Sequence, residues 1–315
     1  MKKFFSVFFS LLFVIALFSA CTDEKKSVEA AKSTGVDNKK LSVVCSIFPQ
    51  YDFCKEIAGD KAELTLLLKS KVDMHNYKPS AEDILKIKSS DLFIDIGGES
   101  DEWADEVLET AKNENLCVLS LIDVVDAKDE ETLEGMEEEE HEEGEEHEHE
   151  EEKDEHVWLS LKNAEVLCSA IADALEEIDP DNKAAYAANA SAYIAELSAL
   201  DKDYSDTVNN AARKTVLFGD RFPFRYMVDD YGLSYYAAFA GCSAETEASF
   251  ETVSFLAKKT DELGLPCILT IEGAKHNIAE TIVQNTGSKD QKILTMDSMQ
   301  ATTSEDVKNG VTYLT

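Results

Sequence analysis

The sequence has little positive charge for its length. Its 315 residues carry 30 Lys and Arg against 64 Asp and Glu, which gives a formal net charge of −34. Nucleic acid is therefore excluded as a partner, because there is no stripe of basic residues to displace counterions from phosphate. A strongly negative field attracts cations instead, so we expect a positively charged ligand.

Half of this negative charge lies in one run. The segment from Asp129 to Glu155 contains 18 Asp and Glu and a single Lys. Four of the six histidines lie within it or directly after it: His141, His147, His149 and His156. Carboxylates suit hard divalent cations, and neutral imidazole suits zinc-like ions. The run is interpreted either as an accessory arm that collects metal weakly through its first three histidines, or as a solvated charge run without a specific role.

No apolar run is long enough for a comfortable membrane span. The longest, Phe4 to Phe18, follows two lysines and is followed by Ser19-Ala20-Cys21. This pattern resembles a bacterial lipoprotein signal peptide (1–21) that is cleaved before a lipid-modified Cys21; an ordinary signal peptide is the alternative. Residues 22–40 are polar and predict a flexible tether. We therefore expect an extracytoplasmic protein that lipid chains anchor to the cell membrane.

Paired cysteine motifs are also missing. The six remaining cysteines show no CxxC spacing, and most lie in apolar segments: Cys45, Cys54, Cys117, Cys168, Cys242 and Cys267. This favours buried small side chains over a zinc ribbon or a disulfide framework, although an exported protein could still oxidise one pair. Cys242 differs from the others because it lies in a Gly-Cys-Ser loop.

Two segments alternate short β-branched runs with helical periods, which predicts parallel sheets covered by helices. The first is an N-terminal α/β lobe (41–180) that contains the acidic insertion (129–155). The second is a C-terminal α/β lobe (212–315). Between them no Gly or Pro interrupts 181–210, and apolar residues recur every three or four positions. The fold class is thus α/β, with two parallel-sheet lobes joined by one long rigid linking helix (181–211).

Polar side chains follow several of the predicted strands. Ligands bind beyond the carboxyl ends of strands in open α/β sheets, so these side chains indicate a cleft between the lobes. The candidates are His75 after 63–68, Asp220 after 215–218, Glu272 and His276 after 267–271, and Asp297 after 292–296. His156 lies where the helix that closes the first lobe begins. This set contains metal ligands rather than the aromatic or Arg clamps of an amino-acid or siderophore binder.

Three stretches resemble the zinc- and manganese-binding substrate-binding lipoproteins of ABC transporters. They are VVCSIFPQYDFCKEIAGDKAEL (43–64), MHNYKPSAEDILKIKSSDLFIDIGG (74–98) and HVWLSLKNAEVL (156–167). The most specific parts are a His two residues before Tyr-x-Pro-Ser, and His-Val-Trp-Leu before Lys-Asn-Ala. The resemblance implies that His75 and His156 are metal ligands from the first lobe and that Asp297 is a ligand from the second. It also implies delivery of the metal to a membrane permease.

The resemblance fails at one expected ligand. Relatives of the zinc type have His, and those of the manganese type Glu, where this chain has Gly219. Asp220 is the first candidate to replace it, followed by His276 and then Cys242, with water or Glu272 as further alternatives. His276 also fits a surface residue at a helix start, and Asp297 a simple turn residue. Zn²⁺ is the expected cargo, with Mn²⁺ as the alternative, and the protein is expected to be a monomer.

Two other classes of function compete with metal transport. An envelope zinc hydrolase needs an open coordination position beside a general base such as Glu272, but there is no HExxH motif. In a surface adhesin, the metal would only stabilise the fold. The interpretation as a transport protein predicts no enzymatic activity.

Overall fold

The computed structural model describes residues 39–68, 74–111, 113–137, 153–243, 247–273 and 275–315. Residues Lys40–Thr315 form one compact unit. The predicted lipid-attachment site Cys21 and the three arm histidines His141, His147 and His149 lie outside the described residues. None of the helices in the described part of the chain has the length and apolar character of a membrane-spanning helix.

The first lobe is built on a four-stranded parallel sheet with the strand order β2-β1-β3-β4. The strands are β1 (Leu41–Cys45), β2 (Ala62–Leu66), β3 (Leu92–Asp95) and β4 (Cys117–Ser120). Val43 pairs with Leu64 on one side and with Leu92 on the other, and all four residues of β3 are buried. The side chains at the strand ends therefore meet at one edge of this sheet.

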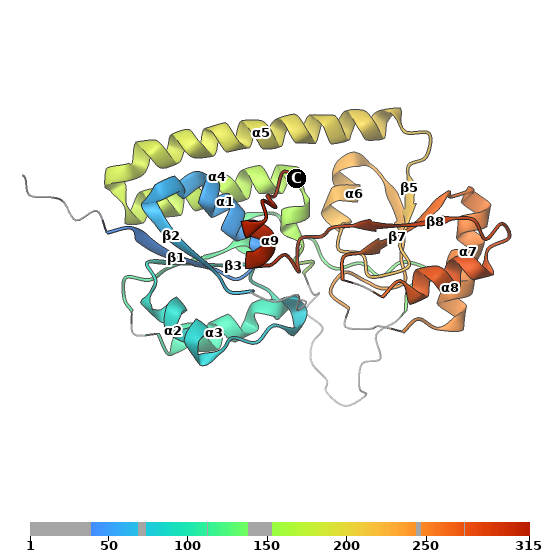
Figure 1. Ribbon diagram of the computed structural model, residues 1–315, viewed down its shortest axis with the longest axis horizontal. Helices are drawn as coiled ribbons and strands as arrows, with labels where there is room; N and C mark the ends of the chain where they lie inside the picture. Colours follow the sequence, from blue (N-terminus) through green and yellow to red (C-terminus); the bar gives the residue numbers. More distant parts are fainter. Residues whose placement is uncertain (1–38, 69–73, 112, 138–152, 244–246, 274) are drawn as a thin grey trace, which may run out of the picture. The chain divides into compact units, whose positions relative to one another are not determined.

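Helices cover both faces of this sheet (Figure 1). One face carries α1 (Phe48–Ala58), α4 (Leu161–Ile178) and α5 (Lys183–Asn210), and the other carries α2 (Ala81–Ser89) and α3 (Glu102–Glu109). A capping box begins α2, because Ser80 accepts the Asp83 amide and Asp83 accepts the Ser80 amide. Phe48 begins α1, with Pro49 in its first turn.

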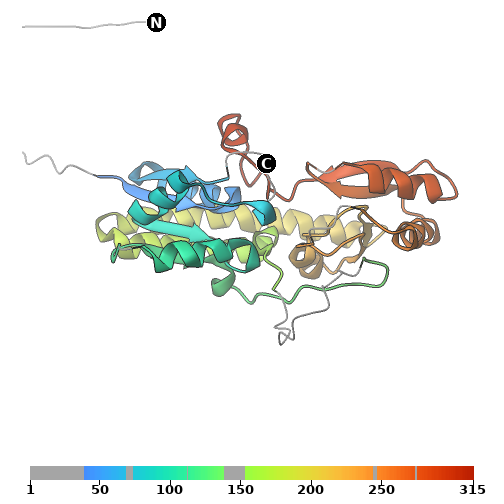
Figure 2. The same ribbon diagram turned by 90° about the horizontal axis from the view of Figure 1, so that it is seen from below.

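The predicted linking helix is α5, which has 28 residues and a length of about 42 Å at 1.5 Å per residue. It passes along both lobes (Figures 1 and 2). Its buried positions are Tyr186, Ala190, Tyr193 and Leu197, and none lies beyond Leu197. Tyr204 is 44% exposed and stacks on Tyr231 of the second lobe with ring centroids 5.8 Å apart. The apolar stripe is therefore buried over only part of the predicted length.

The second lobe contains two pairs of parallel strands. They are β5 (Thr215–Leu217) with β6 (Ser234–Tyr236), and β7 (Cys267–Ile271) with β8 (Lys292–Met296). A parallel bridge between Phe218 and Leu269 joins the pairs through β5 and β7. The helices are α6 (Arg225–Tyr231), α7 (Phe250–Leu263) and α8 (Asn277–Asn285), and the short α9 (Ser304–Lys308) follows β8. Two α/β lobes and one long helix confirm the predicted fold class; the exact lobe boundaries stay predictions.

The beginning of the acidic run lies on the second lobe. Together with the preceding Lys128 it forms residues 128–137, which we call the strap. The Lys128 amide donates to the Tyr226 hydroxyl at 3.0 Å, and the Glu137 amide donates to the Ala238 carbonyl at 2.9 Å. Met136 is buried among the side chains of the second lobe. The beginning of the predicted insertion, up to Glu137, is therefore part of the packed structure.

The last residues of the chain pack against the first lobe. Tyr313 is buried in its core, and the Tyr313 amide donates to the carboxylate of Asp52 at 2.8 Å. The Tyr313 hydroxyl donates to the carbonyl of Trp158. The segment that follows β8 therefore returns from the second lobe and helps to fix the loop after His156.

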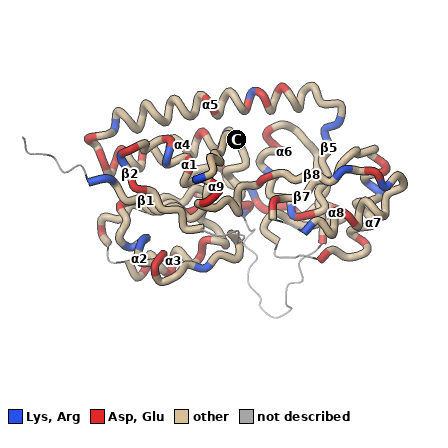
Figure 3. The backbone as a smooth tube through the Cα atoms, viewed as in Figure 1, with Lys and Arg blue, Asp and Glu red and all other residues tan. Residues whose placement is uncertain are grey.

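Basic side chains are scattered along both lobes among acidic ones (Figure 3). Two of them pair with aspartates at the end of α6: Lys128 with Asp229, and Lys162 with Asp230 at 3.1 Å. These lysines are about half exposed, and such surface pairs contribute little to stability. These two ion pairs therefore add little to the connection between the lobes.

Replacing Asp95 by asparagine is expected to stabilise the protein at pH 8. Burial at the end of β3 raises the pKa of Asp95 to about 7, and its Oδ1 atom has no hydrogen-bond partner among the described residues. The folded state therefore holds a proton that the unfolded state loses near pH 4, so stability falls as pH rises from about 4 to 7. Chemical denaturation of Asp95→Asn at pH 8 should show a gain of about 2–4 kcal/mol.

The exposed Asp203→Asn is the control for this measurement and should behave like the wild type at pH 8 and at pH 4. For Asp95→Asn, the gain should shrink as the pH is lowered towards 4. A gain that is equally large at pH 4 would contradict the assignment of a buried, protonated carboxyl.

Candidate metal centre

The structure brings together the two histidines that the sequence motifs predict. His75 lies in a one-turn helix, Met74–Asn76, that follows β2. His156 directly precedes another such turn, Val157–Leu159, which leads into α4. Their ring centroids are 5.4 Å apart. Two loops that are 80 residues apart in the sequence therefore place their imidazoles side by side.

A buried carboxylate fixes the orientation of the His156 ring. The side chain of His156 is fully buried, and its Nδ1 atom lies 2.9 Å from Oδ1 of Asp154. Because a carboxylate oxygen can only accept, Nδ1 carries the proton and Nε2 keeps its lone pair. Nε2 is buried and has no hydrogen-bond partner among the described residues. This is the arrangement of a histidine whose second ring nitrogen is prepared to bind a metal ion.

The surroundings of His156 are strongly acidic. Burial alone lowers the pKa of the imidazole, but the hydrogen bond to Asp154 and the charges of Asp154, Glu155 and Glu130 outweigh it, so the pKa is raised. The acidic groups that stabilise a proton on His156 would stabilise a metal cation at the same position in the same way. The site therefore favours positive charge, and a metal ion competes with a proton for Nε2.

Glu155 offers a second buried donor atom. Its Oε1 atom accepts the Ser100 amide at 2.8 Å, whereas its Oε2 atom is buried without a hydrogen-bond partner among the described residues. Gly98 lies against this carboxylate with a φ of +83°, and a Cβ atom there would lie 2.6 Å from Oε1. Only glycine fits at this position without displacing Glu155. The loop after β3 thus holds the carboxylate in place.

Cys242 reaches the same place from the second lobe. Its amide donates to Oε1 of Glu130 in the strap at 2.7 Å. The preceding Gly241 lies against the His156 ring, and a Cβ atom there would be 3.3 Å from Cε1 and Nδ1 of that ring. Burial, followed by the charges of Glu130 and Asp154, raises the pKa of the Cys242 thiol well above its usual value.

The potential ligand atoms of His75, Glu155 and Cys242 lie within 4.8 Å of one another. Together with His156, whose ring lies beside that of His75, these residues form what we call the His/Glu/Cys cluster. An imidazole pair, a carboxylate and a thiol can hold a divalent transition metal ion. All six cysteines of the described residues are free thiols, so Cys242 is not occupied by a disulfide.

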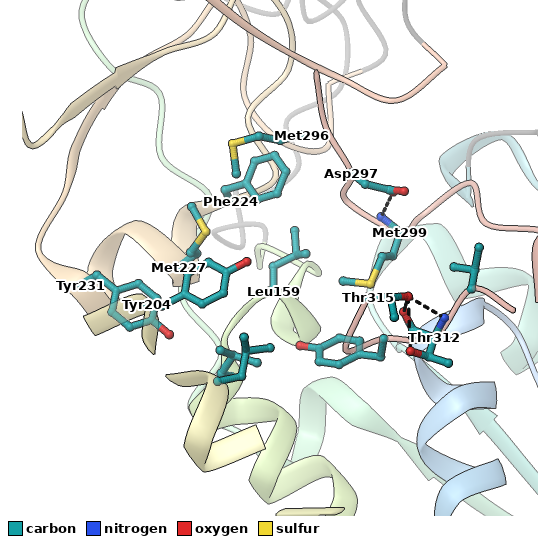
Figure 4. A pocket seen from close by; sticks show the side chains of 14 residues that line it. Leu159, Tyr204, Phe224, Met227, Tyr231, Met296, Asp297, Met299, Thr312 and Thr315 are labelled. Atoms are coloured by element: carbon teal, nitrogen blue, oxygen red, sulfur yellow. Dashed lines mark hydrogen bonds between the residues drawn. The ribbon is translucent and has the colours of Figure 1, made fainter. Parts of the chain in front are cut away.

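The structure does not bring Asp297 into this cluster. Asp297 is exposed, and its Oδ1 atom accepts the Met299 amide at 2.8 Å. It lines a pocket of about 350 Å³ together with Tyr204, Met227 and Met296 (Figure 4). That pocket contains none of the four cluster residues. Metal binding by Asp297 stays a prediction.

The other candidates from the second lobe have structural roles. The carboxylate of Asp220 accepts the amides of Arg221 at 2.9 Å and Ile271 at 3.1 Å. Glu272 accepts the amide and the hydroxyl of Ser298, at 2.8 and 2.7 Å. His276 is the residue that directly precedes α8. The structure places neither Asp220 nor His276 in the cluster, and their role as ligands stays a prediction.

Close packing against α8 explains the glycine at position 219. A Cβ atom there would lie 2.7 Å from Cα of Ala279 in α8, which is closer than such atoms approach. Its amide donates to the Leu269 carbonyl at 2.9 Å and continues the contact between β5 and β7. A histidine or glutamate side chain at this position would push α8 away, so the ligand that relatives are expected to have here must come from elsewhere.

Sequence reasoning missed Glu155 as a ligand and Asp154 as the residue that orients His156. Both were counted in the acidic run. Their position in the sequence could have identified them, because they directly precede His156 and the Val157-Trp158-Leu159 segment that follows it. Cys242 was only a minor alternative for the missing ligand.

Comparison with known proteins identifies the family. Residues 43–315 match the family model ZnuA, described as zinc-uptake complex component A, periplasmic. The zinc-binding lipoprotein AdcA of Streptococcus pneumoniae is 32% identical over 320 residues, and the match covers 100% of this chain and 58% of the relative. The chain thus spans little more than half of that relative. The high-affinity zinc uptake system protein ZnuA of Bacillus subtilis is 32% identical over 309 residues, with 96% and 92% covered.

Solved structures agree with this assignment. The Zn(II)-bound ZnuA-like domain of Streptococcus pneumoniae AdcA has a TM-score of 0.69 and 28% identity, covering 87% of this chain and 94% of that one. The metal-dependent lipoprotein YcdH of Bacillus subtilis has a TM-score of 0.71 and 26% identity, covering 87% and 94%. The family model spans most of the chain, and so do relatives above 30% identity. The chain therefore belongs to the ZnuA family of zinc-uptake proteins.

Proposed function

We propose that this protein is an extracytoplasmic solute-binding lipoprotein that captures Zn²⁺ and delivers it to an ABC permease. The observation that carries the proposal is the His156 ring, whose Nδ1 is held by Asp154 and whose buried Nε2 faces no hydrogen-bond partner among the described residues. His75 lies beside it. Relatives named for zinc binding and zinc uptake support zinc over manganese as the cargo.

The proposal includes the membrane anchor and the partners. Lipid attachment at Cys21 would hold the protein at the outer face of the cell membrane, where a monomer could meet its permease. The relatives named as lipoproteins support this location. A hydrolase is less well supported, because both oxygens of the suggested base Glu272 accept hydrogen bonds from Ser298, and Glu272 is not part of the cluster.

The test is to titrate the purified protein with zinc and with manganese, and to repeat this with residues 138–152 replaced by a Gly/Ser linker of equal length. Glu137 is kept because its carboxylate accepts the Ser249 amide. We expect one tight zinc site per chain in both proteins and a manganese affinity at least about a hundredfold weaker. The linker variant should lose only weak additional zinc binding.

Two results would contradict the proposal. Loss of tight binding in the linker variant would place the main site in the acidic run rather than in the cluster. Tight manganese binding with weak zinc binding would reverse the choice of cargo.

A further inference from the structure

The cluster combines donors of different chemical character. His75 and His156 supply neutral imidazoles, Glu155 supplies a hard carboxylate oxygen, and Cys242 supplies a soft sulfur. A thiolate ligand favours zinc and cadmium, whereas manganese prefers carboxylate, carbonyl and water oxygens. The identity of the second-lobe ligand therefore bears directly on which metals the protein accepts.

Buried negative charge supports the participation of Glu155 in binding a cation. Placing a divalent cation among buried groups is costly unless nearby negative charge neutralises it. Glu155 is 2% exposed, and its Oε2 atom has no hydrogen-bond partner among the described residues. Glu155 brings one negative charge to the ion, the imidazoles add none, and the nearby carboxylates of Asp154 and Glu130 add to the negative field.

The loop that carries Cys242 is held on both sides of the thiol. The Cys242 amide donates to Glu130 of the strap at 2.7 Å, and the next carbonyl, that of Ser243, accepts Nη1 of Arg221 at 3.2 Å. Gly241 packs against the His156 ring. These contacts fix the backbone of the loop, so Cys242 is part of an organised site rather than an isolated surface cysteine.

We propose that Cys242 binds the metal as a thiolate, together with Glu155 and the imidazole pair, and thereby selects zinc-class cations against manganese. This inference rests on the proposed function and assigns its specificity. The reaction is a ligand exchange without a change of oxidation state. The thiol releases its proton to solvent as the sulfur forms its bond to the cation.

Cobalt(II) provides the direct test, because a cobalt–thiolate bond gives an intense near-ultraviolet charge-transfer band that oxygen and nitrogen ligands do not give. We expect this band in the wild type and in Cys267→Ser, which changes another partly buried cysteine of the same lobe. Cys242→Ser should lack it. In a zinc and manganese competition, Cys242→Ser should bind zinc roughly 10- to 100-fold more weakly and manganese almost unchanged.

Thermal unfolding of the metal-free variants shows whether Cys242→Ser is folded, and Cys242→Asp gives a second variant with a hard donor at the same place. The aspartate variant should narrow the preference for zinc over manganese. A cobalt band that persists in Cys242→Ser, or an unchanged metal preference in both variants, would overturn the assignment of Cys242. If the wild type itself binds no zinc, the proposed function fails instead, and the two failures are distinguishable.

Discussion

The His156→Ala variant is expected to bind zinc at least about a hundredfold more weakly than the wild type, because it removes a prepared ligand. In the wild type, Nε2 makes no hydrogen bond to the described residues, so its lone pair is available to the metal ion. Alanine offers no ligand atom in its place. The buried carboxylate of Asp154 would in addition lose its hydrogen bond from the ring and keep the one from the amide of residue 156. Isothermal titration with zinc, using a competing chelator for the wild type, measures the difference.

Two further variants make this prediction specific. Asp154→Asn keeps the shape of the side chain but offers an amide to Nδ1, so we expect a loss of about 10- to 100-fold through misorientation of the ring. His276→Ala, which changes a histidine that the structure does not place in the cluster, should remain within about twofold of the wild type. Equal losses in His156→Ala and His276→Ala would contradict the assignment of the site.

The Trp158→Ala variant is expected to lose about 3–5 kcal/mol of unfolding free energy, because it leaves a large cavity. Trp158 is fully buried in the core of the first lobe. Its indole Nε1 donates to the Ser298 carbonyl at 2.9 Å, and its ring lies 5.3 Å from that of His156 between centroids. Urea denaturation of the metal-free protein checks the loss, and zinc titration should show a weaker site as well.

The Trp158→Phe variant separates the contribution of the hydrogen bond to Ser298 from that of buried packing. It retains most of the buried ring but removes the donor to Ser298, so the loss should be only about 1–2 kcal/mol. If Trp158→Phe and Trp158→Ala were equally destabilised, the hydrogen bond rather than the packing would determine the stability of this region. If neither were destabilised, the residue would not have the buried position that we describe.

Local patterns were sufficient to predict much of the fold. The bounds of β7 and β8 agree with the strands predicted at 267–271 and 292–296, which are short β-branched runs. The burial of α5 was harder to predict. Its apolar residues recur every three or four positions through 208, but its buried residues end at Leu197. A helix that is longer than the lobe it packs on leaves the rest of its apolar face less buried.

Local sequence patterns predict only part of the candidate site. His75 and His156 are predictable because each is embedded in a specific local motif. Glu155 is chemically the same as the other acids of its run, and only the packing of Gly98 and Ser100 distinguishes it. Cys242 depends on contacts with the strap, which is more than one hundred residues away in the sequence. Contacts between distant segments are what a pattern in one sequence cannot supply.

The strap has a mechanical consequence for cargo exchange. Besides α5, the polypeptide links the lobes through residues 128–137 and again through the segment that brings Tyr313 to the first lobe. A body tied at several separated points resists wide opening more than one that turns on a single hinge. Entry and exit of the ion are therefore expected to depend on small local displacements, while the frame itself stays nearly fixed.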